Sequence, residues 1–129
     1  MIFLLADDSR PTRNLIKSYV NELGLNHPPS FLEAETPESA LSIVQTKRVD
    51  FMFLDWNFHA TMSGLDVLKE LRNIEHFKQL PIIMVTSESD KANVIIALKA
   101  GANDFIVKPI DKKSFAEKTM KVINGTRYA

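Results

Sequence analysis

The chain has 129 residues, the size of one globular domain, so we expect a single domain over residues 1–129. Basic and acidic residues are equal in number, 16 of each, and this balance argues against nucleic acid or an anionic membrane as a partner. The absence of cysteine excludes disulfides, thiolate metal sites and a cysteine nucleophile. The apolar run at 1–6 is too short for a signal peptide, so we expect a cytoplasmic protein without membrane segments.

Short apolar runs alternate with segments whose apolar residues recur at helical spacing. A continuous apolar run is typical of a strand buried on both faces, and a spaced stripe is typical of a helix with one buried side. In chain order these patterns predict strand 2–6, helix 15–24, strand 30–32, helix 36–44, strand 51–54, helix 68–74, strand 81–85, helix 94–101, strand 105–107 and helix 115–125. Five successive strand–helix units predict an α/β fold, a doubly wound parallel sheet with helices on both faces.

Polar residues follow four of the predicted strands. Ligands of doubly wound sheets bind beyond the carboxyl ends of the strands, so we expect these side chains to meet at one edge. In chain order they are Asp7, Asp8, Asp55, Thr86, Ser87 and Lys108.

Three carboxylates at one edge are electrostatically unfavourable. Two of them about 4 Å apart repel by about 4 kcal/mol at an effective dielectric constant near 20. A divalent cation relieves this repulsion, and oxygen ligands without His or Cys favour Mg²⁺ or a similar ion. Mg²⁺ also binds phosphate oxygens, which Thr86 and Lys108 could contact in a phosphoryl transfer, and a carboxylate can be the nucleophile that forms an aspartyl phosphate.

Five segments together carry a specific family resemblance: LLADDSRPTR, FLEAETPESAL, DFMFLDWN, IIMVTSES and GANDFIVKP. From residue 2 to about 124 the chain resembles the receiver domains of bacterial response regulators, and among them the stand-alone receivers of chemotaxis. The resemblance implies a flavodoxin-like (βα)5 fold with strand order 2-1-3-4-5. It also implies a phosphorylation-activated signalling switch of a two-component system or phosphorelay. Such a protein is not an enzyme, since it catalyses only its own phosphorylation and dephosphorylation.

The resemblance assigns roles to the three aspartates of this edge and to two of their neighbours. Asp55 is the phosphoacceptor and becomes 4-aspartylphosphate. Asp8 coordinates Mg²⁺ directly, Asp7 coordinates it through water, and Asn57 contributes its backbone carbonyl. Lys108 pairs with the phosphoryl group.

Further positions of the motif concern the signal and its lifetime. Thr86 donates its hydroxyl to the phosphoryl group, and Phe105 matches an aromatic switch residue that turns from exposed to buried as Thr86 moves. The bond from Lys108 to Pro109 is expected to be cis. Asn57 and Glu88 match two variable positions that tune dephosphorylation.

The loop after Asp55 departs from the family pattern. Relatives have a methionine and a proline after the equivalent of Asn57 and reach Gly64 in one residue fewer. The extra residue leaves the path of this loop and the access to Asp55 open, and His59 is expected to be a solvated loop residue.

The expected partners follow from the same resemblance. A sensor histidine kinase or a phosphotransfer protein is the phosphodonor. The output protein, such as the flagellar motor switch, is expected on the face formed by helix 90–100, strand 104–107 and helix 112–124. The five consecutive apolar residues at 94–98 point to all sides of a helix that needs only one buried stripe. This indicates a partner or dimer surface, and burial under a neighbouring helix is the alternative. We expect a monomer or a weak dimer.

Two other interpretations stay open. The chain can be a receiver domain cut from a longer response regulator. An aspartyl-phosphate phosphatase would also use an aspartate nucleophile with Mg²⁺, threonine and lysine. Those enzymes carry an Asp-x-Asp motif after the first strand, and its first aspartate is the nucleophile. Here Asp7 and Asp8 are adjacent, and the lone Asp55 follows the third strand. The receiver is therefore favoured.

Overall fold

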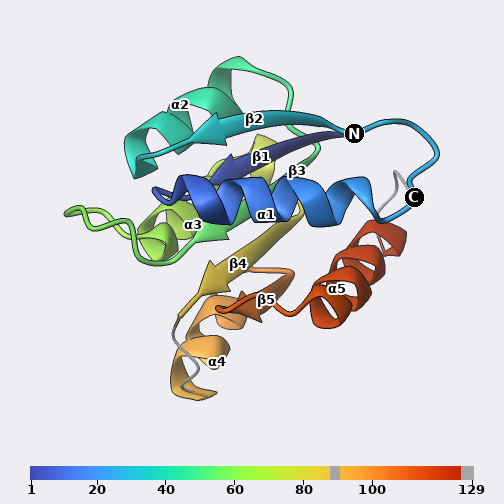
Figure 1. Ribbon diagram of the computed structural model, residues 1–129. Helices are drawn as coiled ribbons and strands as arrows, with labels where there is room; N and C mark the ends of the chain where they lie inside the picture. Colours follow the sequence, from blue (N-terminus) through green and yellow to red (C-terminus); the bar gives the residue numbers. More distant parts are fainter. Residues whose placement is uncertain (88–90, 126–129) are drawn as a thin grey trace.

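The computed structural model describes residues 1–87 and 91–125, and within them strands and helices alternate along the chain (Figure 1). The elements are β1 (Ile2–Ala6), α1 (Arg10–Asn21), β2 (Ser30–Ala34), α2 (Pro37–Thr46), β3 (Phe51–Asp55), α3 (Gly64–Arg72), the 3-10 turn η1 (Glu75–Phe77), β4 (Ile82–Thr86), α4 (Lys91–Lys99), β5 (Asp104–Val107) and α5 (Lys112–Asn124). All ten predicted elements are present. Among the described residues, no helix is long and apolar enough to cross a membrane.

The five strands form one parallel sheet in the order β2-β1-β3-β4-β5, which confirms the flavodoxin-like order. The order reverses at β1, which has β2 on one side and β3 on the other. Ala6 of β1 lies opposite Leu54 of β3 in the register. The next residues, Asp7 and Asp55, therefore leave the same edge of the sheet from neighbouring strands.

Alternate residues of each strand enter two separate cores, one on each face of the sheet. In β3, Phe51 and Phe53 pack into the core under α1 and α5, whereas Met52 and Leu54 pack into the core under α2, α3 and α4 (Figure 1). All four side chains are fully buried. A strand covered on both faces has no solvated side, and this is why the runs read as continuously apolar.

Side-chain caps determine where three helices begin near this edge. Ser9 accepts a hydrogen bond from the Thr12 amide at the start of α1, and Thr36 caps α2, with Pro37 in its first turn as predicted. Ser63 and Asp66 form a reciprocal capping box at the start of α3.

The helices α1, α3 and α5 begin three to five residues before the predicted starts at 15, 68 and 115. The apolar stripe marks only buried positions, whereas the first turn of a helix is polar because its amides need caps. Strand β2 also continues two residues beyond the predicted end, to Ala34, and β4 is shifted by one residue to Ile82–Thr86.

Candidate functional site

The three predicted carboxylates meet at the carboxyl edge of the sheet. Asp7 and Asp8 follow β1 and Asp55 ends β3, and one carboxylate oxygen from each lies within 4.8 Å of the others. Asp7 and Asp55 are both 2% exposed, whereas Asp8 faces solvent. Two buried carboxylates and one solvated carboxylate thus surround a position that an incoming cation can reach from outside.

Lys108 joins the two buried carboxylates. It follows β5, and its Nζ lies 3.1 Å from Asp7 Oδ2 and 3.3 Å from Asp55 Oδ1. Burial lowers the pKa of Lys108, but the attraction of Asp55 and Asp7 outweighs it and the net pKa is raised. The lysine is therefore a fixed positive charge at this edge. Its backbone is held as well, since the Lys108 amide donates to the Thr86 carbonyl at 2.7 Å. The bond from Lys108 to Pro109 is cis, as predicted.

The carboxyl group of Asp55 has a raised pKa. Burial, and next the charge of Asp7, raise its pKa from 3.8 to about 6, although Lys108 and the Asn57 amide oppose the shift. Its Oδ1 accepts hydrogen bonds from Lys108 Nζ and, at 3.3 Å, from the Asn57 amide.

The other oxygen, Asp55 Oδ2, is buried and has no hydrogen-bond partner among the residues that the structure describes. A buried carboxylate oxygen without a partner is costly, so its presence points to a group that binds there. Three carboxylates without His or Cys make a donor set that suits Mg²⁺, and the residues present fit such an ion.

Asp7 is positioned from three directions. The Ser9 amide donates to Asp7 Oδ1 at 2.8 Å, the Asp7 amide donates to the Ala34 carbonyl at 3.0 Å, and Arg13 Nη1 donates to the Asp7 carbonyl at 2.7 Å. These contacts tie the first acidic residue to α1 and β2. Two of the contacts fix the Asp7 backbone, and the bond from the Ser9 amide holds the carboxylate itself.

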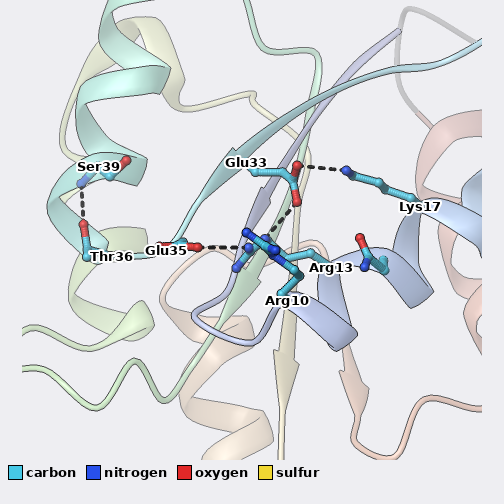
Figure 2. Close-up of a pocket in the computed structure, with 8 residues that line it drawn as sticks. Arg10, Arg13, Lys17, Glu33, Glu35, Thr36 and Ser39 are labelled. Carbon is cyan, nitrogen blue, oxygen red and sulfur yellow. Dashed lines mark hydrogen bonds and ion pairs between the residues drawn. The ribbon is translucent and has the colours of Figure 1, made fainter.

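The sequence analysis missed Arg13. Its guanidinium lies between Glu33 and Glu35 at 2.9 and 3.1 Å, and Lys17 pairs with the same Glu33 from solvent (Figure 2). Although charged, Arg13 is only 3% exposed and is on the buried side of α1 with Ile16 and Val20. That spacing of three and seven residues was the available signal, but an arginine does not count as a core residue in an apolar pattern.

The loop after Asp55 leaves the site open. A pocket of about 600 Å³ reaches the acidic edge. Phe58 turns into the core and is 5% exposed, while His59 adopts a left-handed backbone with φ 47° and lines the pocket from the solvent side. The pocket is lined by Asp8, Ser9, Thr12, Asp55, Trp56, Asn57, Phe58, His59, Ala60, Ser63, Ser87 and Lys108.

Thr86, Asn57 and Phe105 belong to β4, the loop after β3 and β5. Thr86 is the last residue of β4 and is 2% exposed, so its side chain is buried, one residue before Ser87 of the pocket. Asn57 is exposed, and its side-chain amide donates to Ser87 Oγ at 3.4 Å. Phe105 is half-buried on β5. Glu88 lies outside the described residues.

Comparison with known proteins agrees with this architecture. Residues 3–120 match the family of response regulator receiver domains. The chain belongs to this family. The receiver domain is 40% identical to the chemotaxis protein CheY1 of Helicobacter pylori over 127 residues, which cover 98% of each chain. It is also 34% identical to the chemotaxis protein CheY of Pseudomonas aeruginosa, over 97% of this chain and 100% of the relative.

Solved structures show the same fold. The receiver domain superposes on the chemotaxis protein CheY4 of Vibrio cholerae with a TM-score of 0.80 and 25% identity, covering 94% of this chain and 97% of that one. A response regulator of Chloroflexus aurantiacus superposes with a TM-score of 0.84 and 23% identity, over 95% and 97% of the two chains.

Proposed function

We propose that this receiver domain is a phosphorylation-activated switch that accepts a phosphoryl group on Asp55. The observation that carries the proposal is Asp55 Oδ2, a buried carboxylate oxygen without a hydrogen-bond partner among the described residues. The same carboxyl group contacts Lys108 through its other oxygen. A nucleophilic oxygen beside a fixed positive charge is the arrangement that phosphoryl transfer to a carboxylate requires.

The acidic residues would hold the metal in this proposal. Asp8 would ligate Mg²⁺ directly and Asp7 through a water, with Asp55 and the Asn57 carbonyl as the other protein ligands. When bound, Mg²⁺ supplies positive charge that neutralises the carboxylates and the oxygens of the phosphoryl group. The solvent exposure of Asp8 supports its direct role, since it leaves this ligand accessible. Asp7 is buried against Lys108, which supports the indirect one.

The transfer uses the residues as follows. Asp55 Oδ2 attacks the phosphorus atom of a phosphohistidine or a small phosphoramidate. The phosphorus–nitrogen bond breaks, and its electron pair leaves with the nitrogen, which takes up a proton from solvent. Lys108 stabilises the oxygens of the transferring group. Thr86 then donates its hydroxyl to the phosphoryl group, and Phe105 follows this movement inward. The protein is a switch in this scheme, because it catalyses only its own phosphorylation and dephosphorylation.

The output surface that we propose is formed by α4, β5 and α5. Ile95, Ile96 and Leu98 of α4 are each 43% exposed, which is unusual for large apolar side chains and supports a protein partner at this face. The similarity to chemotaxis proteins supports a role in chemotaxis, with a histidine kinase or phosphotransfer protein as phosphodonor and the flagellar motor switch as a candidate output partner. The switch would act in the cytoplasm, as a monomer or a weak dimer.

The test is intact-mass spectrometry after incubation with phosphoramidate and Mg²⁺. We expect the mass of one phosphoryl group to be added to the wild type and not to Asp55→Asn. Asp111→Asn is the matched control, because Asp111 is an exposed cap of α5 that does not line the pocket at the acidic edge, and the change should leave labelling intact. Labelling that persists in Asp55→Asn, or that is absent from the wild type, would contradict the proposal.

A further inference from the structure

Strand β5 lies at the edge of the sheet and has a strand neighbour, β4, on one side only. The backbone of Phe105 is instead bonded by side chains. Its amide donates to Asp104 Oδ1 at 2.8 Å, and its carbonyl accepts a hydrogen bond from Lys118 Nζ at 2.8 Å. The polar groups of an edge strand need such partners when no further strand is present.

Lys118 makes a second contact with the same residue. Its Nζ lies 4.2 Å from the centroid of the Phe105 ring, well within the range of a cation–π interaction. Phe105 packs against the core under α2, α3 and α4, whereas Lys118 comes from α5, which covers the opposite face. The lysine side chain therefore reaches around the edge of the sheet and holds both the backbone and the ring of Phe105.

We propose that Lys118 is the positioning residue that keeps Phe105 in its resting, half-buried position, and that its contact with the ring must break when the ring turns inward. This inference rests on the proposed function, in which Phe105 moves after Asp55 is phosphorylated. A phenylalanine has no hydroxyl group that could fix its position by a hydrogen bond. The ring contact with Lys118 favours one position of the Phe105 ring, since a cation is attracted to the ring face only at close range.

The effect of Lys118 on the position of the Phe105 ring is tested in the unphosphorylated protein. The protein is labelled with fluorophenylalanine, and the Phe105 signal in the fluorine NMR spectrum is assigned by its absence in Phe105→Leu. We expect Lys118→Met to shift or split this signal, because both contacts are lost. Lys113→Met removes an exposed lysine of the same helix and should leave it unchanged. A Phe105 signal that is identical in the wild type and in Lys118→Met would overturn the hold itself.

The coupling to the site is tested by titrating beryllofluoride, an analogue of the phosphoryl group, with Mg²⁺ present. If the resting contact opposes activation, Lys118→Met should bind the analogue about two- to fivefold more tightly than the wild type, the equivalent of one exposed cation–π contact. Lys118→Arg keeps a cation over the ring and should restore wild-type affinity. In the Phe105→Leu background the Lys118→Met effect should vanish.

The outcomes separate this inference from the proposed function. Equal or weaker binding by Lys118→Met would overturn the inference and leave phosphorylation of Asp55 intact. Absence of beryllofluoride binding in the wild type would contradict the proposed function and the coupling together, and the fluorine signal would then report on the resting hold alone.

Discussion

Gly64 lies directly against the backbone of Asp55. A Cβ atom at Gly64 would lie 1.8 Å from the Asp55 carbonyl oxygen, and the Gly64 amide donates to the Trp56 carbonyl at 2.9 Å. The first residue of α3 thus packs on the main chain that carries the proposed phosphoacceptor. The loop of 57–63 ends at this contact, where only glycine leaves room.

We predict that Gly64→Ala is destabilising by about 2–4 kcal/mol, because backbone atoms must move to admit one methyl group. The matched control is Gly125→Ala, where the nearest atom to a new Cβ would be 3.3 Å away and the expected change is under about 1 kcal/mol. Urea unfolding of both variants measures the difference. Equal stabilities of the two variants would show that α3 does not constrain Asp55.

The metal prediction uses Trp56, the sole tryptophan, which is half-buried beside Asp55. We expect Mg²⁺ to change its fluorescence saturably, because the ligands are its immediate neighbours. Asp8→Ala should lose this response, since the solvated ligand is removed and the buried pair keeps its contact with Lys108. An unchanged titration in Asp8→Ala would remove Asp8 from the metal site.

Substitution of Arg13 tests how much its contacts with the Asp7 carbonyl and the two glutamates stabilise the protein. We predict that Arg13→Met destabilises the protein by about 2–3 kcal/mol, since the buried Asp7 carbonyl and Glu35 lose this partner and Glu33 keeps its pair with Lys17 alone. Lys17→Met removes a more exposed pair to Glu33 and should cost under about 1 kcal/mol. Thermal and urea unfolding compare the two. Similar losses would mean that burial of the guanidinium adds nothing.

The residues of the acidic edge could be predicted from the sequence, because each of them ends or follows an apolar run that is typical of a strand. Asp7 follows the central strand β1, Asp55 ends the central strand β3, and Lys108 follows the outer strand β5. Because the strands are parallel, their carboxyl ends lie on the same side of the sheet, so the meeting of these residues is a consequence of topology. This prediction depends on where the strands end in the sequence and not on the contacts of individual side chains. Strand order itself came from the family resemblance, because the apolar runs do not distinguish one neighbour from another.

Other features could not be predicted from one sequence. The buried guanidinium of Arg13 depends on Glu33, which is 20 residues away in the chain. The loop path depends on Phe58, an apolar residue in a polar segment that a pattern cannot direct inward. The contact of Lys118 with Phe105 crosses the edge of the sheet, so neither helical nor strand periodicity marks it.

The carboxylates of the acidic edge should repel one another in the metal-free protein. We predict that Asp55→Asn stabilises the protein by about 1–2 kcal/mol in chelator, because a buried charge is removed. Asp8→Asn should give a smaller gain in stability, since solvent already screens Asp8. Lys108→Ala should be destabilising, because Asp7 and Asp55 lose the cation between them.

Mg²⁺ should reduce or reverse the stability gains of Asp55→Asn and Asp8→Asn, because it stabilises the wild type through binding. Urea unfolding with chelator and with Mg²⁺ decides this. A clear loss of stability in Asp55→Asn under chelator would show that the edge is not repulsive.

The last prediction is the pH dependence of that stored repulsion. The pKa of Asp55 is raised from 3.8 to about 6 by burial and by Asp7, so between these values the folded protein binds its proton more tightly than the unfolded chain does. Stability therefore falls as pH rises through this window, and the cost is fully present above about pH 6. Asp55→Asn has no such proton.

We expect the free energy of unfolding of the wild type, relative to Asp55→Asn, to decrease by roughly 2–3 kcal/mol from pH 4 to pH 7 in chelator. The difference cancels the groups that do not interact with Asp55, and Lys108 stays charged across this pH range because its pKa is raised. Saturating Mg²⁺ should remove this decrease, because the ion favours the charged carboxylate. Urea unfolding of both proteins at half-unit pH steps measures the curve. A difference that stays flat, or that rises with pH, would mean that Asp55 is already ionised at low pH and that the buried carboxylates are compensated without a metal.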